Sequence, residues 1–156
     1  MTNETDLDKT DRKILQVLAR DGRVAWSELA EQVGLSLTPT LRRVRQLEER
    51  GFITGYVAQL DEGRLAGRVC VFVAVTLASQ AEETITRFEE QIALAPEVMS
   101  CFLMTGVADY TLRVVVPDLD AYHRFLTRTL TRIPGVAHIN SSFALKTVLL
   151  RSAPVL

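Results

Sequence analysis

The chain has 156 residues, of which 47% are hydrophobic and 24% charged, a composition typical of a soluble protein with an apolar core. No apolar run approaches the roughly 20 residues of a membrane-spanning helix, and the polar, acidic start is unlike a signal peptide, so we expect a cytoplasmic protein without membrane contact. The net charge is −1, and the first 60 residues carry 9 of the 18 basic and 9 of the 19 acidic side chains. Overall charge therefore does not indicate a nucleic-acid partner, and any such partner must be argued from local charge placement.

The pattern of the first 55 residues predicts three helices, over residues 8–21, 27–33 and 36–50. Each begins beside an Asp, Ser or Thr that can cap it, and a glycine follows each one. Pro39 is tolerated in the third helix because the N–H groups of a first turn have no partner within the helix. A short helix, a tight turn and a longer helix suggest a helix-turn-helix, although helical hairpins also occur in unrelated proteins.

The third predicted helix has an apolar side and a side rich in long polar side chains. At about 100° per residue, one stripe collects Leu37, Leu41, Val44 and Leu47, with Thr40 packed at its edge. The opposite side carries Thr38, Arg42, Arg45, Gln46 and Glu49, with Arg43 and Arg50 at the flank. A helix in the DNA major groove needs such donors, because arginine can bond both acceptors of a guanine edge. We expect contacts to base edges from Arg42, Arg45 and Gln46, and contacts to phosphates from Ser36, Thr38 and Arg43.

The competing interpretation is a solvated helix face on which Glu48 and Glu49 pair with the arginines. The short helix before it, the turn at Gly34 and the lack of acidic side chains ahead of Glu48 in this helix favour DNA. We expect Trp26, just before the second helix, to lie in the core rather than to stack on a base.

The pattern changes after the third helix. Ile53, Tyr56 and Val57 suggest a short extended piece, and the polar stretch 61–68 contains two glycines, which is typical of a hinge. We therefore predict a DNA-binding domain over residues 1–56, a linker and hinge strand over 57–68, and a second domain over 69–156.

The second domain alternates strands and helices. Strands are predicted over 69–77, 98–105, 110–116 and 136–150, and helices over 81–95 and 117–133. The order strand-helix-strand-strand-helix-strand is that of a ferredoxin-like split βαβ domain, so the predicted fold class is α+β. Two of the strands are almost continuously apolar, which calls for cover on both faces of the sheet. Helices can cover one face, and the same sheet of a second subunit, related by a two-fold axis, can cover the other.

The second domain lacks the side-chain patterns of an enzyme. His123 and His138 have no nucleophile or metal-ligand partner at a suitable spacing, and there is no glycine-rich phosphate loop. Cys70 and Cys101 stand alone in apolar surroundings, where we expect buried thiols rather than metal ligands. We therefore predict no catalytic residue, no metal and no cofactor.

The connection between the second and third strands contains a lone carboxylate. Gly106 can adopt positive φ or let a ligand approach closely, and Asp109 begins an otherwise apolar strand. A charge there is costly unless it is paired, and a ligand ammonium is one suitable partner. The alternative is that Asp109 caps the turn through its own side chain.

Several segments together resemble the leucine-responsive regulator/AsnC (Lrp/AsnC) family. They are Leu7–Leu15, Leu29–Ser36, Thr38-Pro39, Arg42–Glu48, Gly51–Ile53, Gly55-Tyr56, Ile133–Val136 and Ser141–Lys146. The segment Gly106–Tyr110 is similar to the Gly-x-x-Asp-Tyr motif of that family's amino-acid-sensing domain. Leu37 replaces a frequent Pro and Thr40 a frequent Cys, both on the packed side of the helix.

The resemblance implies that an effector binds between neighbouring dimers, near this loop. At the positions that match the family's effector-binding residues, this sequence has Thr105, Gly106, Asp109, Tyr110 and Ser141, and we expect these to bind the effector. Val107 and Ala108 give the loop a less polar rim than is common in the family, which favours an apolar amino acid. The resemblance also implies a homodimer that associates further, for example into a tetramer or an octamer.

The predicted function is therefore a sequence-specific, double-stranded-DNA-binding transcriptional regulator whose activity is modulated by an amino-acid effector. Two other functions remain open at this point. One is an architectural DNA-binding protein without an effector. The other is an enzyme or ligand carrier built on the ferredoxin-like half, with the helical half as a protein-interaction module.

Overall fold

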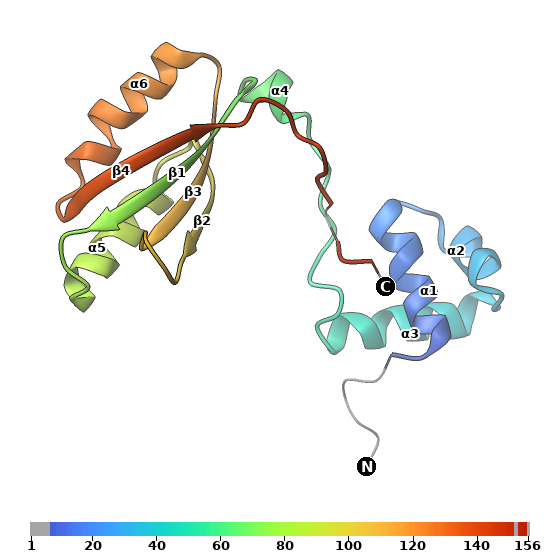
Figure 1. Ribbon diagram of the computed structural model, residues 1–156. Coiled ribbons are helices and arrows are strands. Elements are labelled where there is room, and N and C mark those ends of the chain that lie inside the picture. Colours follow the sequence, from blue (N-terminus) through green and yellow to red (C-terminus); the bar gives the residue numbers. More distant parts are fainter. Residues whose placement is uncertain (1–6, 152, 156) are drawn as a thin grey trace. The chain divides into compact units, whose positions relative to one another are not determined.

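The computed structural model describes residues 7–151 and 153–155, and it divides the chain into two compact units (Figure 1). One unit comprises residues 1–59 together with 149–156, and the other comprises residues 60–148. The first six residues of the predicted DNA-binding domain lie outside the described residues. None of the described helices combines the length and the apolar character that a bilayer crossing demands.

The first unit contains the three predicted helices, α1 (Lys9–Arg20), α2 (Trp26–Val33) and α3 (Leu37–Glu49). Asp8 caps α1, since its carboxylate accepts a 2.7 Å hydrogen bond from the Asp11 N–H. α2 begins after Ala25 rather than after Ser27, and α2 ends at Gly34. The three helices are therefore confirmed, with small shifts at their ends.

The core of the first unit joins one side of each helix. Ile14, Leu29, Val33, Val44 and Leu47 form it, and each is at most 7% exposed. Thr40 is fully buried, as predicted, and its hydroxyl donates to the Ser36 carbonyl at 2.9 Å. The prediction for Trp26 is wrong: it occupies the first position of α2, outside this cluster, and is 42% exposed.

An ion-pair cluster joins α3 to α1. The Arg43 Nη1 atom lies 2.6 Å from an Asp8 carboxylate oxygen and 2.7 Å from one of Asp11. The bond from the Asp11 N–H, and then the Arg43 guanidinium, lower the pKa of Asp8 below its ordinary value. The cluster adds a polar contact between α3 and the start of α1 beside their apolar packing.

The segment that follows α3 is irregular until a short helix, α4 (Glu62–Leu65), in the stretch predicted as a hinge. No strand partner lies beside residues 53–60 among the described residues, so the extended piece forms no ladder. α4 is tied to the sheet unit because both Glu62 carboxylate oxygens accept hydrogen bonds from the Arg113 guanidinium.

The second unit is a four-stranded antiparallel sheet with two covering helices. Along the chain it runs β1 (Val69–Leu77), α5 (Glu82–Ala93), β2 (Val98–Leu103), β3 (Tyr110–Val116), α6 (Leu119–Arg128), a 3-10 turn η1 (Leu130–Arg132) and β4 (Val136–Phe143). The strand order is β2-β3-β1-β4, which confirms the ferredoxin-like α+β prediction. β4 stops at Phe143 rather than near residue 150, so the predicted strand is seven residues too long; one further hydrogen bond, from the Ala144 N–H to the Cys70 carbonyl at 2.9 Å, follows its last paired residue.

Burial alternates along β1 and separates the two faces of the sheet. α5 and α6 lie on one face of the sheet (Figure 1). Val71, Val73, Val75 and Leu77 are buried in the core cluster with residues of these helices, whereas Phe72, on the other face, is 45% exposed. The expectation of two buried thiols is wrong. Cys101 lies on the edge strand β2 and is exposed, and Cys70, on the open face, is only half-buried.

Removal of the Asp8 charge is expected to destabilise the first unit in a pH-dependent way. Asp8→Asn keeps a capping side chain but loses the pairing with Arg43, which should cost about 0.2–1 kcal/mol near neutral pH. Because folding lowers the pKa of Asp8 below 3.8, the contribution is complete above that value and is lost as the pH falls through the lower folded pKa. Urea unfolding followed by Trp26 fluorescence at several pH values checks this. A stability difference that persists unchanged at pH 2 contradicts it.

Gly67 allows a close approach that a side chain would prevent. Its φ is +121°, and a Cβ atom there would lie 2.3 Å from the Val116 carbonyl oxygen. Gly67→Ala is therefore expected to cost roughly 1–3 kcal/mol or more, measured by calorimetric unfolding. Gly106→Ala is the matched control, because Gly106 has a φ of +130° but no atom within 4 Å of an added Cβ. Equal losses in the two variants would show that backbone strain alone, and not the contact, sets the cost.

Candidate functional site

The outward side of α3 presents a polar surface. Five of the six predicted DNA-contacting residues are exposed along it, namely Ser36, Thr38, Arg42, Arg45 and Gln46. A shallow hollow of about 430 Å³ runs along this side, and it is lined by Thr38, Leu41, Arg42, Arg45, Gln46 and Glu49. Because the opposite side of α3 is buried, these side chains are held outward by the packing of the helix itself.

The arginines on this surface share the hollow with one acid, Glu49. Among the described residues, neither Arg42 nor Arg45 forms an ion pair. Glu48 instead accepts a 3.0 Å hydrogen bond from the Tyr56 hydroxyl. Burial, followed by this bond, raises the pKa of Tyr56 to about 12, so Tyr56 stays a donor at neutral pH. The competing interpretation was a solvated face on which acids pair with the arginines. That pairing is not found for Arg42 and Arg45 in the described part of the chain.

Arg43, the sixth predicted residue, takes a different place. It lies at the flank of α3 with a side chain 29% exposed, and Nη1 contacts Asp8 and Asp11. These two carboxylates raise the pKa of an already basic group. The predicted phosphate contact from Arg43 thus competes with an internal ion-pair cluster that the sequence analysis missed, because 35 residues separate Arg43 from Asp8.

The β2–β3 connection presents a small exposed surface in the second unit. Thr105 and Gly106 are exposed, and Val107 at the tip is fully so. The Met104 N–H donates to the Asp109 carbonyl at 2.8 Å and closes the connection. Since no atom lies within 4 Å of a Cβ placed on Gly106, a ligand or a second chain can approach its backbone closely.

Asp109 joins this connection to the end of β1. Its Oδ2 accepts a 2.7 Å hydrogen bond from the Leu77 N–H, and its Oδ1 accepts a 3.0 Å bond from the side-chain amide of Gln80. The Asp109 N–H in turn donates to the Val75 carbonyl at 3.0 Å. The carboxylate therefore holds the loop against the end of β1, through residues distant in the sequence rather than through the local turn cap of the alternative interpretation. No sequence pattern pointed to Gln80, which is 29 residues away.

Tyr110 and Ser141, two further predicted effector residues, have internal partners. Tyr110 is 1% exposed, its ring centroid lies 4.6 Å from that of Phe88, and its hydroxyl donates to Glu89 at 2.7 Å. Burial, and then the contact with Glu89, raise the pKa of Tyr110. The Ser141 hydroxyl lies 2.5 Å from the Tyr122 hydroxyl. Ser141 is on β4, and β1 lies between β4 and β3 in the sheet, so Ser141 is remote from the β2–β3 connection. One chain thus brings Thr105, Gly106 and Asp109 together, but not Ser141.

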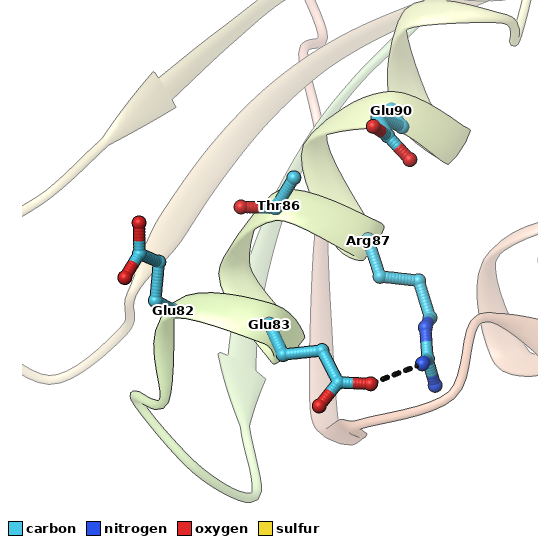
Figure 2. Close-up of a pocket in the computed structure, with 5 residues that line it drawn as sticks. All are labelled: Glu82, Glu83, Thr86, Arg87 and Glu90. Carbon is cyan, nitrogen blue, oxygen red and sulfur yellow. Dashed lines mark hydrogen bonds and ion pairs between the residues drawn. The ribbon is translucent and has the colours of Figure 1, made fainter.

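A second hollow, of about 490 Å³, lies on the outer side of α5 (Figure 2). Its lining consists of Glu82, Glu83, Thr86, Arg87 and Glu90, all from this one helix. Arg87, the cation of the set, donates to Glu83 at 2.7 Å. This surface offers little to the carboxylate of an amino acid, and it contains none of the predicted effector residues.

Two protein-family models match the two parts of the chain. The winged helix-turn-helix DNA-binding model matches residues 7–54, and the Lrp/AsnC ligand binding domain model matches residues 70–154. The second match alone covers more than half of the chain and includes the β2–β3 connection.

Individual proteins agree with these matches. The chain is 64% identical over 151 residues to the Bkd operon transcriptional regulator of Pseudomonas aeruginosa, with 97% of this chain and 99% of that protein covered. It is 45% identical over 131 residues to the leucine-responsive regulatory protein of Escherichia coli K12, with 84% and 80% covered. A transcriptional regulator from Neisseria meningitidis, solved as an L-Met complex, superposes with a TM-score of 0.91 at 38% identity, over 96% of this chain and 97% of that one. These matches confirm the predicted family: the chain belongs to the Lrp/AsnC transcriptional regulators, which join a DNA-binding helix-turn-helix to a ligand-binding domain.

Proposed function

We propose that this regulator recognises DNA with the outward side of α3 and that an amino acid bound at the β2–β3 connection modulates this recognition. The single observation that carries the DNA part is the exposed side of α3, where two arginines without ion pairs among the described residues flank a shallow hollow. Long donors on a helix of this kind suit the acceptors of the major groove.

The α3 side chains divide into two roles in this proposal. Arg42, Arg45 and Gln46 contact base edges, because they line the hollow near the middle of the outward side. Ser36 and Thr38 contact phosphates from the start of the helix, where free backbone N–H groups also favour anions. Arg43 contributes by holding α3 against α1 rather than by a direct contact.

The effector part rests on the exposed connection and on the relatives. Thr105, Gly106 and Asp109 offer a hydroxyl, an open backbone and a carboxylate, which suit the ammonium and carboxylate ends of an amino acid. One relative is named for its response to leucine, and one structural neighbour is an L-Met complex. The exposed Val107 beside these residues favours an apolar amino acid.

The open face of the sheet supports a homodimer. Cys70, Phe72 and Ala74 of β1 lie on this face, which α5 and α6 leave uncovered, and Phe72 is 45% exposed. The same face of a second copy, related by a two-fold axis, would cover it and would place two copies of α3 on a near-palindromic site. Association of dimers at the β2–β3 connection would then enclose the effector between them.

Loss of Arg45 is expected to weaken binding to the preferred site selectively. The site is first selected by the full-length protein from random DNA. Arg45→Ala should then cost about 1–3 kcal/mol on that site and less on random DNA, measured by equilibrium titration at fixed salt. Arg20→Ala is the matched control, because it removes the same charge from the exposed end of α1. An equal loss on both DNAs would reassign Arg45 to a phosphate contact.

Loss of the Asp109 charge is expected to weaken amino-acid binding. Asp109→Asn keeps a carbonyl oxygen that can accept the Leu77 N–H bond, but it can no longer pair with an ammonium. Affinity for L-leucine or L-methionine, measured by isothermal titration on the full-length protein, should fall roughly 10–100-fold. Unchanged affinity would show that Asp109 does not bind the effector and only holds the loop against the end of β1.

A further inference from the structure

The two oxygens of Asp109 have partners of different kinds. Oδ2 accepts from a main-chain N–H at the end of β1, where Leu77 is buried in the sheet core. Oδ1 accepts from the side-chain amide of Gln80, an exposed residue between β1 and α5. The first bond is fixed by the fold, whereas the second depends on the rotamer of one solvated side chain.

The Gln80 amide resembles a weaker version of the group that the proposed effector would bring. Both are N–H donors to a carboxylate oxygen, but the amide is neutral and an ammonium carries a full charge. Charge-assisted hydrogen bonds between two ions are stronger than those in which only one partner is charged. An ammonium that reaches Oδ1 can therefore replace the amide, and the cost is one hydrogen bond that Gln80 can make to water instead.

We propose that Gln80 sets the affinity for the effector: its amide occupies the exposed oxygen Oδ1 of Asp109 and competes there with the amino group of the ligand. The inference rests on the proposed function, because it assumes that Asp109 receives the effector ammonium. It adds a competitor that comes from the protein itself, and this competitor lowers the affinity for every ligand that binds at this oxygen.

The charge of Asp109 selects the chemical class of the ligand. A free amino acid brings a charged donor, whereas an N-acetyl amino acid brings only a neutral N–H, like the amide of Gln80. The site therefore discriminates against N-acylated and peptide-bonded amino groups. Because the competing amide lowers the affinity of both ligands by the same factor, the discrimination is expected to be the same in Gln80→Ala.

The experiment compares two substitutions at this position in the full-length protein. Gln80→Ala removes the competing donor, and affinity for L-leucine and L-methionine should rise roughly 2–10-fold by isothermal titration. Gln80→Lys places an ammonium of the protein itself near Oδ1, and affinity for the same two amino acids should fall at least about tenfold. Gln91→Ala is the matched control, because it removes an exposed glutamine from α5 in the same unit, and affinity should not change.

The outcomes separate this inference from the proposal beneath it. If Asp109→Asn binds the two amino acids as tightly as the parent, the proposed effector site is wrong and the role of Gln80 falls with it. If Asp109→Asn loses binding while Gln80→Ala is unchanged or weaker, the effector site stands and the competition is overturned. The third readout is the ratio of L-leucine to N-acetyl-L-leucine affinity, which should be the same in Gln80→Ala as in the parent. A changed ratio would show that Gln80 contacts the ligand itself and would contradict simple competition.

Discussion

The burial of one side of α3 determines which of its side chains can meet another molecule. Thr40, Val44 and Leu47 pack against α1 and α2, and at 3.6 residues per turn this packing leaves Arg42 and Arg45 on the opposite side. The ion pairs from Arg43 to Asp8 and Asp11 add a polar contact between α3 and the start of α1. The proposed recognition surface is thus a consequence of core packing, and on this proposal substitutions in that core would alter DNA binding without touching DNA.

In the second unit, too, only one side is buried: one face of the sheet packs against the helices. Alternate residues of β1 and β3 fill the space beneath α5 and α6, and these helices leave the other face of the sheet uncovered. Asp109 links the exposed β2–β3 connection to the centre of this sheet through β1. On the proposal above, a ligand bound to this carboxylate would act on the end of β1 through the Leu77 N–H. An effector nevertheless changes DNA affinity only through different affinities for two states of the protein.

Local patterns were enough to predict most elements of this fold. The apolar periodicity of α3 and the β-branched runs of β1 and β3 reflect burial that each segment shows by itself. Contacts between distant segments could not be predicted, since no local pattern marks the bond from Gln80 to Asp109 or the pairing of Arg43 with Asp8. The same reason explains the errors at Trp26 and Cys101: each lies in an apolar stretch, but at a helix start and on an edge strand, where the fold provides no cover. Tyr110 and Ser141 were predicted by resemblance alone, and their internal contacts appear only in three dimensions.

The central claim is that the outward side of α3 lies in the major groove and contacts base edges. The most direct measurement is a structure of the full-length protein bound to a DNA site selected from a random pool. The account predicts Arg42 and Arg45 within hydrogen-bonding distance of base acceptors, about 2.7–3.2 Å, with the buried side of α3 unchanged. A structure in which both arginines contact protein, while another surface meets the DNA, would contradict it.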